Sequence, residues 1–241
     1  MEVLDHTFKA LRMNMNWIVF FSVPFLLAFT IPLLTPLPSY IAMGGTFLRT
    51  GSIPNMSGFE LGIVILASLL SIFFISFALV SINILIKHKR TFTQIPKEVI
   101  DGIENYTLSL FWILVTSEIL YFVVYLIAYE YSVQNVAGPL FTFIVSLGLF
   151  YAPAAIVIDD MRPFRAVQAS FRHIYRKPML FFIWMLIAFI ALMSLDILSV
   201  VLKDSLPFGR YLFLVVNSVI LLPFLIVFQT QIYLTKYTIL K

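Results

Sequence analysis

The 241-residue sequence contains no cysteine. This absence excludes disulfide bonds, thiolate metal sites and cysteine nucleophiles. Charged residues are also scarce, at 12% of the chain, whereas 61% of the residues are hydrophobic. The mean hydropathy of +1.00 lies far outside the range of soluble domains, so the composition predicts an integral membrane protein.

The N-terminus lacks the basic segment and the short apolar stretch of a cleaved signal peptide, so the first hydrophobic segment is expected to remain in the protein. A bilayer crossing takes about 20 helical residues. A chain of 241 residues therefore has room for about six crossings and for no separate soluble domain. We expect a single membrane domain over residues 1–241.

Long apolar runs are the main feature that the sequence does have. Six of them are long enough to cross a bilayer as helices. They cover Trp17–Leu34, Leu61–Ile86, Leu108–Tyr129, Pro139–Ile158, Met179–Val201 and Tyr211–Leu234. The expected fold class is therefore an all-α integral membrane protein with six transmembrane helices.

Lys and Arg are unevenly distributed between the two sides of this predicted topology. Of the 16 basic residues, all but Arg49, Lys203 and Arg210 lie on the side that holds both termini. Basic residues are enriched in cytoplasmic loops, so we expect a multi-pass protein of the cell membrane with cytoplasmic N- and C-termini. The basic layer also suits anionic lipid head groups, although its more ordinary role is to set the orientation.

Residues 163–176 predict an amphipathic helix at about 100° per residue. Its apolar face holds Phe164, Val167, Phe171, Ile174 and Tyr175, and its basic face holds Arg165, Arg172 and Arg176. Such a helix is too polar to span a membrane, so we expect it to lie in the cytoplasmic interface. Asp159 and Asp160 are expected to cap its N-terminus. Arg165, Arg172, Arg176 and Lys177 are the candidate contacts to lipid head groups.

Similar spacings of apolar residues occur three times, each before a pair of spans. The sets are Leu4, Phe8 and Leu11; Val99, Ile103 and Tyr106; and Val167, Phe171 and Ile174. We therefore expect three units, at about 1–90, 91–160 and 161–241. Each unit would be a cytoplasmic interfacial amphipathic helix followed by a transmembrane hairpin.

The stretch "APAAIVIDDMRPFRAVQASFRHIYRKPMLFF" combines an apolar helix end, Pro153, an acidic turn, Pro163 and a basic segment before Pro178. It resembles the membrane domain associated with glycerophosphodiester phosphodiesterases and with related uncharacterised six-helix membrane proteins. "HTFKALRMNMNW" resembles the usual entry to that domain. In that family the phosphodiesterase is a separate soluble barrel, for which these residues leave no room. The resemblance thus implies a fold and a membrane role without hydrolysis.

Proline residues interrupt several spans. Pro24, Pro32, Pro153 and Pro223 lie within or at the ends of apolar runs. Each proline frees a backbone carbonyl group, which has to find a partner on a neighbouring helix. Gln229 and Gln231, near the inner end of the last span, are expected to form hydrogen bonds between helices.

Three polar residues lie inside apolar segments and form the candidate intramembrane site. Glu118 is expected near the middle of the membrane, and Asp196 and Asn217 nearer its outer surface. Because ionisable groups are costly in a membrane, Glu118 is a candidate proton or cation site, with Asp196 and Asn217 as its outer mouth. The simpler alternative is that Glu118 is protonated or hydrogen-bonded to a neighbouring helix, while Asp196 snorkels or pairs with Lys203.

Catalytic and metal-binding patterns are missing from the sequence. His6, His88 and His173 are far apart and are expected on polar faces. We expect no enzymatic activity, no cofactor, no metal and no nucleic-acid partner. The predicted function is non-catalytic organisation or binding of membrane components, either lipids, a partner membrane protein or further copies of the chain. The alternative is a small transporter or channel that uses Glu118.

Overall fold

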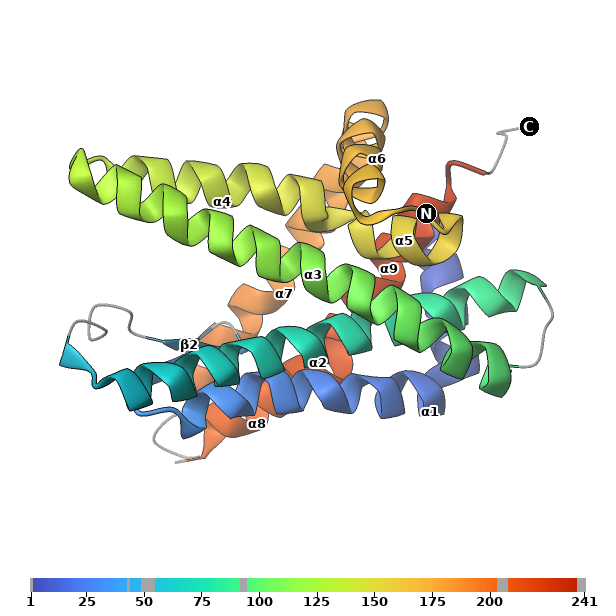
Figure 1. The fold of residues 1–241 in the computed structure, drawn as a ribbon. Coiled ribbons are helices and arrows are strands. Elements are labelled where there is room, and N and C mark those ends of the chain that lie inside the picture. Colours follow the sequence, from blue (N-terminus) through green and yellow to red (C-terminus); the bar gives the residue numbers. More distant parts are fainter. Residues whose placement is uncertain (1, 43, 49–54, 92–94, 203–207, 238–241) are drawn as a thin grey trace.

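The structure is a computed structural model that describes residues 2–42, 44–48, 55–91, 95–202 and 208–237 (Figure 1). Six helical spans are long and apolar enough to cross a membrane. They are Val3–Leu34, Gly58–Lys87, Gly102–Glu130, Gln134–Asp159, Pro178–Val201 and Gly209–Leu234. The prediction of an all-α, multi-pass membrane protein with six helices of spanning length and hydropathy is confirmed.

The first two spans pack against each other and are joined by a small β-hairpin. The elements are α1 (Glu2–Thr30), the 3-10 turn η1 (Ile31–Leu34), β1 (Ser39–Ala42), β2 (Gly45–Leu48) and α2 (Gly58–Thr91). The two strands are antiparallel, with Tyr40 opposite Phe47. α1 has a kink at Asn14, whose φ of −126° and ψ of 21° are not helical. The kink therefore lies where the sequence changes from charged to apolar.

The remaining four spans include several interruptions. The elements are α3 (Ile95–Glu130), α4 (Gln134–Phe150), α5 (Ala152–Asp159), α6 (Pro163–Arg176), α7 (Pro178–Val201), α8 (Gly209–Val216), the π-helical segment η3 (Asn217–Leu221) and α9 (Leu222–Leu234). α6 is a separate helix that lies across the direction of the spans (Figure 1). α3, by contrast, is one continuous helix, so the expected separate middle interfacial helix is not seen. The side chain of Val99 lies outside the described residues.

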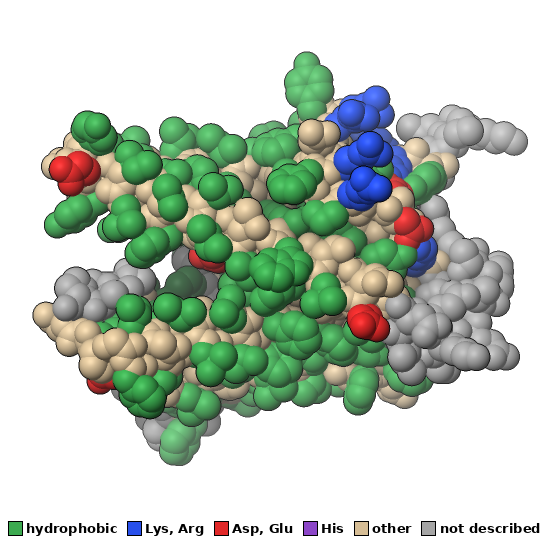
Figure 2. Space-filling view, viewed as in Figure 1, with side chains coloured by type: hydrophobic (Ala, Val, Ile, Leu, Met, Phe, Trp, Pro, Cys, Tyr) green, Lys and Arg blue, Asp and Glu red, His purple; other side chains and the backbone are tan. Residues whose placement is uncertain are grey.

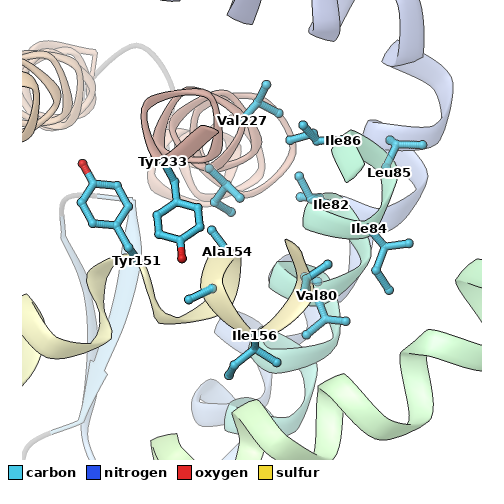
Figure 3. Close-up of a cluster of buried hydrophobic side chains, with 14 of the residues drawn as sticks. Val80, Ile82, Ile84, Leu85, Ile86, Tyr151, Ala154, Ile156, Val227 and Tyr233 are labelled. Carbon is cyan, nitrogen blue, oxygen red and sulfur yellow. The ribbon is translucent and has the colours of Figure 1, made fainter. Parts of the chain in front are cut away.

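The buried core lies where α2, α5 and α9 meet (Figure 3). Ile82 and Leu85 of α2, Ile156 of α5 and Val227 of α9 are almost completely buried. A polar contact crosses the same core, because the hydroxyl of Thr230 in α9 donates a hydrogen bond of 2.8 Å to Asn83 Oδ1 in α2. α2 is therefore the central helix of this buried core.

The two ends of the bundle differ in charge and in packing. We call the end where α1 begins and α9 ends the basic end, because Lys and Arg side chains gather there (Figure 2). The other end, which carries β1 and β2, is the hairpin end. Here large apolar side chains of α3 and α4, such as Phe122, Ile127 and Phe143, are exposed. Figure 2 shows open space between α3–α4 and the layer of α1 and α2. An exposed apolar surface of this kind suits contact with lipid.

The fourth span is broken between α4 and α5. Tyr151 has a φ of −96° and a ψ of 2°, and Pro153 has no N–H group. The hydroxyl group of Ser170 in α6 forms a hydrogen bond with one backbone group on each side of the break. The backbone N–H of Tyr151 donates to Ser170 Oγ at 2.9 Å, and the Ser170 hydroxyl donates to the Leu147 carbonyl oxygen at 2.7 Å. The hydroxyl group thus stands between two backbone groups that an unbroken helix would join directly.

A residue of α9 provides another hydrogen bond to the backbone at this break. The side-chain amide of Gln229 donates a hydrogen bond to the carbonyl oxygen of Phe150, the last residue of α4. The prediction that Gln229 bonds between helices is confirmed. Neighbouring helices thus satisfy the Leu147 and Phe150 carbonyl groups beside the break. The Leu149 carbonyl, which the missing N–H of Pro153 leaves free, accepts instead from the Tyr151 N–H of the same span.

Replacing Ser170 by alanine is expected to lower the free energy of unfolding by about 1–3 kcal/mol, because the Tyr151 N–H and the Leu147 carbonyl lose their buried partner. Denaturant unfolding in a mild detergent measures this loss. Ser146→Ala is the matched control, since Ser146 is exposed and bonds to the Phe143 carbonyl of its own helix. Equal losses in the two variants would show that Ser170 does not hold α6 in place.

Candidate functional site

The turn between α5 and α6 carries two aspartates, and each is bound by residues from other helices. Asp159, the last residue of α5, accepts a hydrogen bond of 2.6 Å from the Tyr233 hydroxyl. Lys236 forms an ion pair with the same carboxylate, and Tyr237 also donates to it. Asp159 therefore joins the end of α5 to the end of α9.

Asp160 adopts a left-handed conformation, with a φ of 51°. Its carboxylate pairs with Lys87 of α2, whose Nζ lies 3.2 Å from Oδ1, and it accepts a hydrogen bond from Tyr106 of α3. Lys87 also donates to the Val157 carbonyl oxygen at 2.6 Å. The turn is thus attached to α2 and α3 as well as to α9.

The prediction that Asp159 and Asp160 cap α6 is wrong. The N-cap residue is Arg162, and no side chain caps the helix there. Both carboxylates are instead occupied by lysine and tyrosine side chains from other elements. The first turn of α6 itself contains no acidic residue.

A pocket of about 510 Å³ lies beside this turn. It is lined by Asp159, Asp160, Met161, Arg162, Arg165, Gln168, Ala169 and Arg172. We call it the arginine pocket. Its three arginines are exposed, and their side chains make no hydrogen bond or ion pair with the residues that the structure describes. Guanidinium groups match phosphate and carboxylate oxygens in pairs, so the pocket is suited to an anion.

The predicted head-group contacts divide into two groups. Arg165 and Arg172 line the arginine pocket, whereas Arg176 and Lys177 are not among its lining residues. Lys177 donates to the backbone and side-chain oxygens of Thr235 at 2.9 and 2.8 Å, so it ties the start of α7 to the end of α9. Arg162 also lines the pocket and was not singled out from the sequence. Extending the helical wheel by one residue would have placed it on the face of Arg165 and Arg172.

His173 is buried, which corrects the prediction that it lies on a polar face. The residue is 6% exposed, and its ring centroid lies 4.7 Å from that of Tyr151 and 5.2 Å from that of Tyr233. The reason is that α6 buries the face that carries Ala166, Ser170 and His173. Packing against the broken span thus determines the orientation of the helix.

Burial lowers the pKa of His173 to about 4, because the charged imidazolium would lose its hydration. The nearby positive charges of Lys177, Lys236 and Arg176 lower the pKa further, while a hydrogen bond with the Ile232 backbone acts in the opposite direction. The histidine is therefore neutral at pH 7.

Two of the three predicted intramembrane site residues, Asn217 and Asp196, lie beside Gly44. The Asn217 side chain is buried and donates to the Gly44 carbonyl oxygen at 2.7 Å, which holds the turn of the β-hairpin. Gly44 has a φ of +67°, and a Cβ atom there would lie 2.5 Å from Asn217 Cβ. Asp196 borders Gly44 too, in a cavity of about 10 Å³ that Arg210 also lines. Its proposed partner Lys203 lies outside the described residues.

Glu118 is not part of this group. It is exposed on α3 and lines neither of these cavities, and its side chain makes no hydrogen bond or ion pair with the described part of the chain. The expected hydrogen bond from Glu118 to a neighbouring helix is therefore not found among the described residues. Transport through Glu118 stays a prediction.

No protein-family model matches the chain, and no curated protein or solved structure matches it either. The resemblance to the membrane domain of glycerophosphodiester phosphodiesterases therefore stays a prediction.

The buried His173 is expected to destabilise the protein at low pH. The pKa of His173 is about 4 in the folded protein, whereas the ordinary value for a histidine is 6.5. As the pH falls, the unfolded chain therefore takes up the proton first. The free energy of unfolding should have its full value above pH 6.5 and fall by up to about 3 kcal/mol toward pH 4. Unfolding curves recorded across this range measure the loss.

Two variants separate the contribution of His173 from that of other titrating groups. His173→Gln should remove this part of the pH dependence, whereas His6→Gln, which changes an exposed histidine, should keep it. A His173→Gln protein that loses stability with pH as steeply as the wild type would contradict the assignment.

Proposed function

We propose that this protein is a non-catalytic membrane protein that binds anionic phospholipids through the arginine pocket. The observation that carries the proposal is a pocket of about 510 Å³ lined by Arg162, Arg165 and Arg172, whose guanidinium groups have no carboxylate partner among the described residues. Pockets of about 300–1,000 Å³ are typical of sites for small ligands. The volume therefore fits a whole head group.

The position of α6 supports a lipid as the ligand. Phe164 and Tyr175 are 80% and 89% exposed, although both are aromatic. Aromatic side chains are enriched at the boundary between lipid and water, and a helix with one basic and one aromatic side is suited to lie there. In this arrangement α6 lies in the membrane interface, and the arginine pocket opens at the level of the phosphates.

The orientation of the protein follows from the basic end. Because Lys and Arg favour the cytoplasmic side, the arginine pocket and both chain ends are cytoplasmic in a cell membrane, and the β-hairpin is outside. The same arrangement makes α6 the interfacial helix of the third unit. The kink at Asn14 supports an interfacial segment at the start of the first unit.

Arg172→Gln is expected to weaken the binding of an anionic phospholipid by about tenfold or more, because it removes a charge-assisted hydrogen bond of about 1.5–3 kcal/mol. The measurement is a titration of the detergent-solubilised protein with dioctanoyl phosphatidylglycerol. Arg176→Gln is the matched control, since it removes the same charge one turn further along α6 but outside the pocket. It should weaken binding by no more than about fivefold, the effect of one surface charge.

Equal losses in Arg172→Gln and Arg176→Gln would contradict the proposal. So would a wild-type protein that binds phosphatidylglycerol no better than dioctanoyl phosphatidylcholine, which has no net charge. The melting temperatures of both variants are recorded without lipid, so that a loss of folding is recognised.

The orientation is tested by introducing single cysteines, which the natural sequence lacks. Asn55 at the hairpin end and Tyr175 on α6 are both exposed. Asn55→Cys should react with a membrane-impermeant thiol reagent in intact cells. Tyr175→Cys should react with it only after the cells are permeabilised. The reverse pattern would place the arginine pocket outside the cell.

A further inference from the structure

The arginine pocket has a surplus of positive charge. Its two carboxylates are already neutralised, because Asp159 pairs with Lys236 and Asp160 pairs with Lys87. Arg162, Arg165 and Arg172 remain, without a described partner of opposite charge. The described side chains thus leave three guanidinium charges for a ligand.

The number of charges bears on the kind of phosphate that fits. A phosphodiester, as in phosphatidylglycerol, carries one negative charge. A phosphomonoester carries about 1.5 to 2 negative charges at pH 7 and three terminal oxygens that accept hydrogen bonds. Three guanidinium groups, each with several N–H donors, match the monoester more completely.

We propose that the arginine pocket selects ligands with a terminal phosphomonoester over ligands whose only anionic group is a phosphodiester. This inference rests on the proposed function and specifies the ligand class of the same site. The shared chemistry occurs in lipids with a terminal phosphate and in small soluble phosphomonoesters, and the experiment separates the two sources.

The backbone that carries the lining residues is held in place before a ligand binds. Arg165, Gln168 and Arg172 lie on α6, whose buried face is held by Ser170 at the broken span. Ala169 lines the pocket between these residues. A larger side chain at Ala169 would occupy the pocket without changing any charge, so it tests whether ligands bind inside.

The test compares two lipids on the full chain in a neutral detergent. Dioctanoyl phosphatidic acid ends in a phosphomonoester, and dioctanoyl phosphatidylglycerol has only a phosphodiester. The wild type should bind the first at least ten times more tightly. In Arg172→Gln this ratio should fall below about threefold, whereas Arg176→Gln should keep it. The ratio of affinities is the readout, because a general loss of charge or stability weakens both lipids together.

Two further arms locate the binding and identify its source. Ala169→Phe should abolish the preference for phosphatidic acid while its melting temperature without lipid remains close to that of the wild type. Ala169→Leu replaces it if the larger variant fails to fold. Competition with glycerol 3-phosphate distinguishes the sources: displacement of phosphatidic acid at a similar concentration identifies a soluble phosphomonoester as the ligand, and no displacement identifies a lipid.

The outcomes separate this inference from the proposed function. Equal affinities for the two lipids, both reduced by Arg172→Gln, would overturn the selectivity but leave the arginine pocket as a lipid site. Binding of both lipids that is insensitive to Arg172→Gln and to the Ala169 variants would overturn the proposed function as well.

Discussion

A backbone break inside a hydrophobic span must be repaired by hydrogen bonds from elsewhere in the protein, since an unpaired N–H or carbonyl group in lipid costs several kcal/mol. The fourth span has such a break at Tyr151, and Ser170 provides both an acceptor and a donor for it. Because Ser170 is on α6, this repair attaches α6 to the spanning bundle. The position of the arginines on the same helix follows from that attachment.

The pairing of the acidic turn has an equally direct consequence for the charge of the arginine pocket. If Asp159 and Asp160 had capped α6, their carboxylates would stand beside its first turn and neutralise the arginines there. They bind Lys236 and Lys87 instead, which draws the turn toward α9 and α2. The same contacts that hold the turn therefore leave the guanidinium groups unneutralised.

The six spans could be predicted from the sequence because an apolar run of about 20 residues matches the thickness of a bilayer and is rarely found in a soluble domain. The contacts of the acidic turn could not be predicted. Asp160 binds Lys87 and Tyr106, which are 73 and 54 residues away in the sequence. Helical periodicity relates a residue only to its near neighbours, so it assigned Asp160 to the adjacent helix. His173 was misplaced for the same reason: its polarity suggested a surface position, whereas its contacts with Tyr151 come from another span.

Uneven packing fixes the backbone on which the arginine pocket is built. At the basic end, buried side chains of α2, α5 and α9 fix the elements to which its walls are attached, whereas α3 and α4 expose apolar side chains at the hairpin end. A fixed backbone limits the entropy cost of binding to the ordering of the arginine side chains. Affinity then depends on how well guanidinium groups match the oxygens of the ligand. Lysine would keep the charge at these positions but lose the planar, paired donors that make this match.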